Sequence, residues 1–294
     1  MVASAVPVTA LLRLARPKQW TKNFLVVAAA LAAGSLGHHG AWLKAGLAFI
    51  AFCAIASGIY ALNDVRDRHE DAAHPTKCRR PIASGEVSPS VGGIFGACLI
   101  AGGLLLTVTL PPLVTLVAQA YVVLTLTYTL IWRHIVVLDL FSIAGGFVLR
   151  AVAGGVAVGV PLSVWFLLVI TFAAVMVAAG KRDSELARVR LSSRQPRAVL
   201  RVYTHRTLRA LMVAACGAAM IAYVLWALAQ SASVGFPWRL LTAVPFGLAM
   251  ARYLVLARAG ASEAPDELLL HDRPMLGAAG LWLIVFALGV SAGA

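Results

Sequence analysis

Long apolar runs, each about the length of one membrane crossing, constrain the fold of this chain more than any other feature of its sequence. A transmembrane helix needs roughly 20 predominantly apolar residues, because lipid leaves every backbone polar group to be satisfied within the helix. Such spans are predicted near residues 24–37, 41–62, 91–110, 112–131, 136–158, 162–180, 207–230, 239–257 and 275–292. The expected fold is all-α, a single polytopic membrane domain over residues 1–294 with about nine transmembrane helices.

Composition supports lipid as the solvent of these helices. Hydrophobic residues make up 61% of the chain and charged residues only 13%, whereas soluble domains average about half and about a quarter. A soluble core could not bury that much apolar surface. Glycine pairs at 145–146 and 154–155 fall within one apolar run and predict close helix packing.

The segments between the predicted spans alternate between short, nearly uncharged connectors and long, basic ones. Most of the 25 Lys and Arg residues fall on one side, above all in the candidate catalytic loops near 63–90 and 181–205. Basic loops stay in the cytoplasm, so these loops and the N-terminus are expected at the cytoplasmic face of the cell membrane. The net charge of +13 is first a topology signal and second a source of groups that bind anionic lipids and phosphates. No nucleic-acid partner is expected.

An acidic cluster closes the second predicted span, at Asn63, Asp64, Asp67 and Asp71. On a continuous helix the three aspartates fall within about 60° of one another. Carboxylates on one face repel each other; a divalent cation relieves that repulsion, and oxygen-only ligands favour Mg²⁺ over zinc. Because Mg²⁺ completes its shell with water and substrate phosphates, the three aspartates predict a catalytic Mg²⁺ site and a phosphorylated substrate. The alternative is a solvated helix end whose acids pair with nearby arginines: Arg66, Arg68 and Arg79.

A cationic segment follows the acidic cluster directly. Lys77 and Arg80 can bind the phosphate charge that a metal ion leaves unneutralised. The alternative is a basic loop that serves only membrane topology. That alternative explains the cations but not their closeness to the acids.

These residues resemble the first signature of the UbiA superfamily of intramembrane prenyltransferases. The resemblance rests on Asn-Asp-x-x-Asp-x-x-x-Asp at residues 63–71, followed by Lys77 and Arg80-Pro81-Ile82-x-x-Gly85. It implies that superfamily's helical bundle, which the predicted spans fit, and Mg²⁺-dependent chemistry on a diphosphate.

Finer features resemble the phosphoribosyltransferase branch of that superfamily. They are Arg16-Pro17-Lys18-Gln19-Trp20-x-Lys22-Asn23, residues 74–77, Gly180-Lys181-Arg182-x-x-Glu185-Leu186 and residues 265–273. The resemblance implies transfer of 5-phosphoribose from phosphoribosyl pyrophosphate to a polyprenyl phosphate lipid such as decaprenyl phosphate, for synthesis of a cell-wall arabinan precursor. The alternative is a UbiA-type prenyltransferase that joins a prenyl diphosphate to an aromatic or other acceptor. A lipid or ion transporter would explain the spans but not the acidic stripe.

A phosphorylated donor and a phosphorylated lipid acceptor together need more positive charge than a neutral aromatic acceptor does. The candidate substrate-binding residues are Asn63, Arg16, Lys18, Lys22, Lys77, Arg80, Tyr128, Lys181, Arg182 and Glu185. A second acidic motif is thin, since Asp183 and Glu185 are two residues apart and do not share a helix face. Glu185 is expected in the site, and Asp183 is left open between a weak metal ligand and a partner of Arg182.

Charges inside predicted spans are costly and indicate function by default. Asp139 and Arg150 fall about three helical turns apart, too far to pair along one helix. Asp139 is expected near the cytoplasmic entrance, where it can contact ribose hydroxyls or Arg133. Arg150 is expected to be a structural ion-pair partner or hydrogen-bond donor. The lipid chain length is left open, and so is a homo-oligomeric state.

Overall fold

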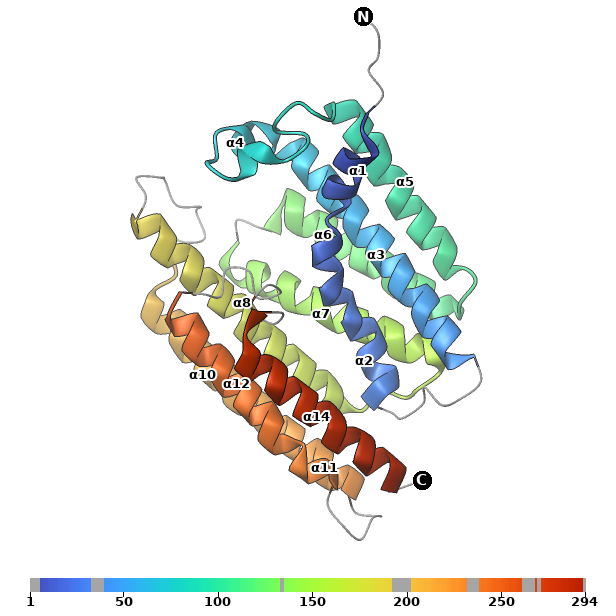
Figure 1. Ribbon diagram of the computed structural model, residues 1–294, viewed down its shortest axis with the longest axis vertical. Helices are drawn as coiled ribbons and strands as arrows, with labels where there is room; N and C mark the ends of the chain where they lie inside the picture. The colour runs from blue at the N-terminus through green and yellow to red at the C-terminus, as the bar shows by residue number, and fades with distance from the viewer. Residues whose placement is uncertain are drawn as a thin grey trace, which may run out of the picture. The chain divides into compact units, whose positions relative to one another are not determined.

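The computed structural model describes residues 6–32, 40–132, 135–191, 202–231, 238–260, 268 and 271–292. Helices, turns and short connectors account for these residues, and none of the described ranges contains a β-strand (Figure 1). The all-α fold class is therefore confirmed.

Seven helices within the described ranges are long and apolar enough to cross a membrane. They are α3 (Ala41–Arg66), α5 (Pro89–Thr107), α6 (Pro112–Leu130), α7 (Val136–Val158), α8 (Val164–Leu191), α10 (His205–Ser231), and α11 (Trp238–Leu241) taken together with α12 (Ala243–Arg258). Each matches one predicted span. The described residues stop at the end of α2 (Phe24–Ala32), and α14 (Arg273–Ala292) is apolar over a shorter stretch. The count of nine spans and the cytoplasmic N-terminus stay predictions.

The chain divides into two compact units. The first comprises Met1–Thr129 and Leu149–Pro161, and the second comprises Leu130–Val148 and Leu162–Ala294. Helix α7 contributes to both units, since the division falls within it. Hydropathy treats each span separately and does not predict this division, and the expected single domain over residues 1–294 stays a prediction.

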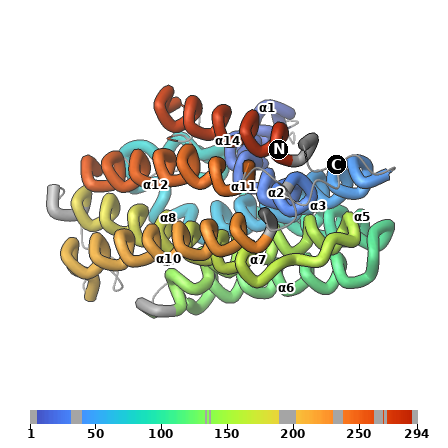
Figure 2. The backbone as a smooth tube through the Cα atoms, turned by 90° about the horizontal axis from the view of Figure 1, so that it is seen from below, coloured from blue at the N-terminus to red at the C-terminus, as the bar shows by residue number. Residues whose placement is uncertain are grey.

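Within the first unit, α5 packs along α3 at very short range (Figure 2). A Cβ added to Gly58 would lie 2.5 Å from the carbonyl oxygen of Gly96, and one added to Gly96 would lie 2.9 Å from the carbonyl oxygen of Gly58. Both positions therefore need glycine. Phe52, Ile55 and Val114 belong to the buried core around this pair of helices.

The C-terminal half of α7 approaches α2 just as closely. A Cβ on Gly154 would lie 1.6 Å from the carbonyl oxygen of Val26, which confirms the close packing predicted for this glycine-rich stretch. One turn earlier, Arg150 is buried and donates from Nε to Asn23 Oδ1 at 2.7 Å and from a terminal nitrogen to the Tyr121 hydroxyl at 2.6 Å. The expectation that Arg150 is a structural hydrogen-bond donor is confirmed.

Within the second unit, α8 packs along α10, and α12 packs along α14 (Figure 1). A buried cluster of large side chains fills this unit: Met176, Leu208, Met212, Tyr253 and Met275. Asp272 caps α14 by accepting the backbone N–H of Met275 at 3.0 Å, and Arg252 of α12 donates to it at 2.8 Å. The hydrogen bond from Arg252 is the main reason that the pKa of Asp272 lies below its usual range, and the backbone bond from Met275 acts in the same direction.

Helix α8 runs further than the sequence pattern predicted. Residues 181–191 continue the helix, so the loop expected from 181 begins later; residues 192–201 of that loop lie outside the described residues. Glu, Leu, Ala and Arg are good helix formers, and Arg182 pairs with Glu185 one turn on. These local preferences carry the helix past the end of its apolar part.

Candidate functional site

The acidic cluster lies where α3 ends. Helix α3 stops at Arg66, and α4 (Arg68–Ala72) begins after Asp67, whose φ of −87° and ψ of 9° lie in the bridge region rather than the helical one. The backbone N–H of Asp67 still donates to the Asn63 carbonyl at 2.9 Å, and that of Asp71 to the Asp67 carbonyl at 2.8 Å. The expected uninterrupted helix is wrong at this one residue. Across the described part of the chain, no group of three or more His, Cys, Asp or Glu side chains gathers to hold a metal ion by itself.

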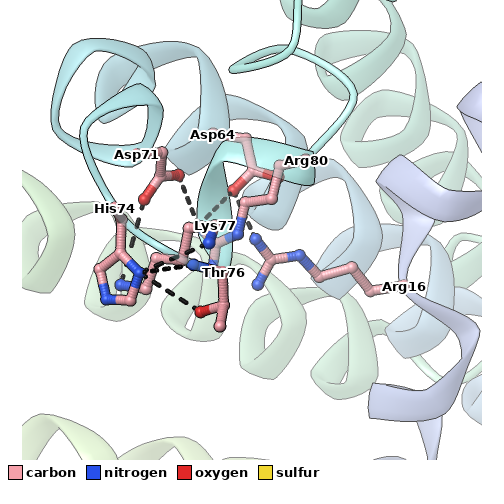
Figure 3. Close-up of polar contacts among 7 residues, drawn as sticks. All are labelled: Arg16, Asp64, Asp71, His74, Thr76, Lys77 and Arg80. Atoms are coloured by element: carbon pink, nitrogen blue, oxygen red, sulfur yellow. Dashed lines mark hydrogen bonds and ion pairs between the residues drawn. The ribbon is translucent and has the colours of Figure 1, made fainter.

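Asp64 and Asp71 nevertheless come together, because Arg80 bridges them (Figure 3). One terminal nitrogen of Arg80 donates to Asp64 Oδ1 at 3.1 Å and to Asp71 Oδ2 at 2.6 Å. Lys77 Nζ lies 4.0 Å from the other oxygen of Asp71. Asp64 is only 2% exposed and Asp71 only 3%. Two nearly buried carboxylates thus share cations from the segment that the sequence pattern placed beside them.

A further cation reaches Asp64 from the N-terminal segment. Arg16, between α1 (Val8–Ala15) and the 3-10 helix η1 (Pro17–Asn23), donates to the same Asp64 oxygen as Arg80 does (Figure 3). Its guanidinium also lies 5.2 Å from the centre of the Tyr60 ring, a cation–π contact. The predicted residues Arg16, Lys77 and Arg80 are therefore brought to one pair of carboxylates.

The loop that carries Lys77 and Arg80 is fixed at both of its ends. At its start, His74 Nδ1 accepts the backbone N–H groups of Thr76 at 3.3 Å and Lys77 at 3.4 Å. At its end, Gly85 has a φ of 81°, which suits glycine, and Ile82 and Val87 are buried against α1 and α3 residues. The arginine and lysine thus extend from a loop that is packed onto the same unit as the carboxylates.

Asn63 supplies an observation that points to a bound group. Its Oδ1 is buried and has no hydrogen-bond partner, the only such side-chain N or O atom within the described ranges. Buried polar atoms are almost always satisfied, so an orphan oxygen indicates a missing donor or cation. Asn63 directly precedes Asp64 on α3, and an amide oxygen together with carboxylate oxygens is a donor set that fits a hard cation such as Mg²⁺.

Three other predicted site residues of this unit are described without a contact to these carboxylates. Lys18 is exposed on η1, Lys22 donates to Gln19 Oε1 on the same short helix, and Tyr128 is half-buried on α6. Their predicted roles in substrate binding stay predictions.

In the second unit, the predicted cation Arg182 pairs with the buried Asp139 and the half-buried Glu185. It forms a bidentate pair with Asp139, with both N–O distances at 2.5 Å, and a further terminal nitrogen donates to Glu185. Asp139 is fully buried and Arg182 is 3% exposed. Asp139 thus pairs with Arg182, while Arg133, its expected partner, lies outside the described residues. Lys181 is half-buried on the same helix.

Asp183 pairs with α10 rather than with Arg182. His205 Nδ1 lies 2.5 Å from one oxygen of Asp183, and Arg209 Nε donates to the other at 3.2 Å. Asp183 and Glu185 therefore have different partners, as their spacing predicted, and the alternative that made Asp183 a partner of Arg182 is wrong. The physical reason is that consecutive residues of α8 point to different neighbours.

Sequence reasoning missed several residues that shape these clusters. Tyr60 had a local signal, since it lies one helical turn before Asp64 on α3. Ser57, His205 and Arg209 had none, because their contacts join segments far apart in the chain.

Comparison with known proteins agrees with this architecture. Residues 23–271 match the UbiA prenyltransferase family. The decaprenyl-phosphate phosphoribosyltransferase of Corynebacterium glutamicum is 38% identical over 281 residues, which cover 94% of this chain and 85% of that protein. The enzyme of the same name from Mycolicibacterium smegmatis is 38% identical over 282 residues, covering 90% and 87%.

A solved structure shows the same fold. The UbiA homolog from Archaeoglobus fulgidus bound to GPP and Mg²⁺ superposes with a TM-score of 0.74, at 15% identity, over 96% of this chain and 99% of that chain. At this identity the likeness concerns the fold alone. The match over residues 23–271 and the extended identity to two curated enzymes show that the chain belongs to the UbiA prenyltransferase family and is a multi-pass membrane transferase.

Proposed function

We propose that the protein transfers 5-phosphoribose from phosphoribosyl pyrophosphate to a polyprenyl phosphate, with decaprenyl phosphate as the expected lipid, and releases pyrophosphate. The observation that carries the proposal is the identity of 35–38% to decaprenyl-phosphate phosphoribosyltransferases over most of both chains. The product would supply a cell-wall arabinan precursor. The reaction is expected at the cytoplasmic face, where basic loops stay.

The cluster around Asp64 suits the diphosphate of the donor. Asp64 and Asp71 would hold Mg²⁺, directly or through water, and the orphan oxygen of Asn63, the residue before Asp64, would be a further ligand. Asp67, at the break between α3 and α4, is a further candidate ligand. A bound Mg²⁺ would act as a Lewis acid that neutralises charge on the departing pyrophosphate. The remaining diphosphate charge would be bound by the cations of the cluster: Arg16, Lys77 and Arg80.

The transfer itself is a displacement at ribose C1. The bond from C1 to the diphosphate oxygen breaks, a lipid phosphate oxygen bonds to C1, and pyrophosphate leaves with the electron pair. The attacking phosphate is already an anion and needs no general base. Arg80 and Lys77 would stabilise the negative charge that develops on the leaving group. A single displacement inverts C1, so net retention would exclude this direct route.

The test is transfer of label by the purified protein in lipid vesicles. With ribose-labelled phosphoribosyl pyrophosphate and decaprenyl phosphate, label should enter the lipid only when Mg²⁺ is present. Asp64→Asn should lower the rate by about two orders of magnitude or more, since it removes a metal-binding charge. Glu86→Gln is the matched control: it removes one acid of the same unit, which pairs at the surface with Arg13, and should leave the rate unchanged. A near-normal rate for Asp64→Asn would remove the metal assignment.

The second candidate is transfer of a prenyl group, favoured by the fold likeness to a homolog bound to GPP. The same preparation supplied with labelled prenyl diphosphate and an aromatic acceptor separates the two. Incorporation from prenyl diphosphate, with none from phosphoribosyl pyrophosphate, would overturn the proposed substrates while leaving the transferase class intact.

A further inference from the structure

The carboxylate of Asp64 holds two guanidinium groups at one oxygen. Arg16 and Arg80 both donate to Oδ1, and Arg80 also donates to Asp71. A carboxylate that is only 2% exposed keeps its negative charge only where cations or hydrogen bonds compensate it. The two arginines provide that compensation, at the atoms where a metal ion would bind.

The position of Arg16 is set by the fold. It is the only non-glycine residue with positive φ in the described part of the chain, at 52°, a conformation that residues with a Cβ seldom adopt. Ser57 of α3 fixes the turn: its hydroxyl donates to the Ala15 carbonyl at 2.7 Å and accepts the Trp20 indole N–H at 3.0 Å. An unfavourable backbone conformation persists where the surroundings hold it, and such positions cluster at functional sites.

The charge balance of the cluster opposes a metal ion that arrives alone. Arg16, Lys77 and Arg80 already neutralise the carboxylates of Asp64 and Asp71 before any ligand binds. A divalent cation would therefore add unbalanced positive charge and would have to displace guanidinium groups from Asp64. A diphosphate that enters with the cation supplies negative charge for the displaced arginines. Metal and diphosphate should therefore strengthen each other's binding.

We infer that Arg16 is a counterion latch: it pairs with Asp64 in the absence of ligands and transfers to the diphosphate when the metal and the diphosphate bind together. The inference rests on the proposed function only for the identity of the ligands, a divalent cation and a diphosphate. It assigns Arg16 two alternating partners, Asp64 and phosphate. Removing Arg16 should therefore help the metal bind alone and hinder the diphosphate.

These opposite effects can be measured without turnover. Binding of Mn²⁺ alone, in place of Mg²⁺, is followed by electron paramagnetic resonance of the free ion. Binding of labelled inorganic pyrophosphate at saturating free Mg²⁺ is followed by equilibrium dialysis. In Arg16→Gln, Mn²⁺ alone should bind about tenfold more tightly and pyrophosphate about tenfold more weakly, in the usual range of coupling between two ligands. A residue that only supports the fold would weaken both.

Arg13→Gln is the matched control, because it removes the same charge three residues earlier on α1, where Arg13 pairs with Glu86. Both affinities should stay at the wild-type value. Arg16→Lys keeps the charge and should restore most of the metal–diphosphate coupling. This variant still tests the latch if the glutamine variant does not fold.

The outcomes separate the latch from the proposed function. Unchanged or weaker Mn²⁺ binding in Arg16→Gln, with weaker pyrophosphate binding, makes Arg16 an ordinary phosphate ligand and overturns the latch while the proposed function stands. If the wild-type protein binds neither Mn²⁺ alone nor pyrophosphate in the presence of Mg²⁺, both the latch and the proposed function are overturned, because the cluster is then not the diphosphate site.

Discussion

At the scale of single residues, two asparagines of the first unit have buried side-chain oxygens in opposite states. Asn23 Oδ1 accepts from Arg150 at 2.7 Å, and Asn23 Nδ2 lies 3.2 Å from the sulfur of Cys53. Asn63 Oδ1 has no partner. A satisfied buried amide stabilises the fold, whereas an unsatisfied one destabilises it by about 1–3 kcal/mol. The first belongs to the packing of the unit, and the second fits the metal site proposed at Asp64 and Asp71.

Asn63→Ala should therefore keep or raise the melting temperature of the ligand-free protein. It should lower phosphoribosyl transfer by about tenfold or more, since a group that would contact the ligand is lost. Asn23→Ala, the matched control, should lower the melting temperature because it removes the acceptor of a buried guanidinium. Intrinsic tryptophan fluorescence during heating and the lipid-labelling assay give the two readouts. If Asn63→Ala melts as early as Asn23→Ala, the orphan oxygen is not a reserved ligand position.

The sequence could predict some contacts of the cluster and not others, for a reason of chain distance. Arg80 is nine residues from Asp71, so its closeness to the acids follows from the local pattern. Arg16 is 48 residues from Asp64, and their contact depends on a left-handed turn and on Ser57, neither of which has a local signature. The pair of Asp139 with Arg182, 43 residues apart, is unpredictable for the same reason.

At the scale of helices, hydropathy predicts where spans lie but not which of them touch. The span expected at 91–110 is found as α5, Pro89–Thr107, since roughly 20 apolar residues suffice to specify a crossing. Its contact with α3 depends on Gly58 meeting Gly96, a pairing that no single run of sequence contains. Leu62 also contacts this position, and the next two residues of α3 are Asn63 and Asp64, so the packing of α5 supports the candidate site.

Gly96→Ala should destabilise the protein, because its new Cβ would lie 2.9 Å from a backbone carbonyl oxygen that cannot turn away. Overpacking of this kind costs about 1–3 kcal/mol. Gly93→Ala on the same helix is the matched control: nothing lies within 4 Å of its Cβ, and alanine should stabilise the helix by about 0.5–1 kcal/mol. The melting temperature in detergent should fall for the first variant and hold or rise for the second. Equal shifts for both would contradict the close approach of α3 and α5.

At the scale of the whole molecule, the sequence predicts orientation through charge rather than through contacts. The loop between α3 and α5 is rich in Lys and Arg, whereas the connector between α7 and α8 at residues 159–163 carries no charge. The positive-inside rule places the first in the cytoplasm and the second outside. A native cysteine offers a direct test of this orientation. Cys78 is half-buried in the basic loop, between Lys77 and Arg79, whereas Cys53 is buried within α3.

A variant that keeps Cys78 and replaces Cys53, Cys98 and Cys216 by alanine should react with a membrane-impermeant maleimide in inside-out vesicles and not in intact cells. The reason is that Cys78 lies in the loop expected to face the cytoplasm. The matched control carries all four cysteine replacements together with Val160→Cys in the uncharged connector, and it should react in intact cells only. Pyrophosphate with Mg²⁺ should slow labelling of Cys78 several-fold, since the neighbouring Lys77 would then be covered by the diphosphate. Labelling of Cys78 in intact cells would reverse the predicted orientation of every span and place the candidate site on the outer face, where a cytoplasmic sugar donor could not reach it.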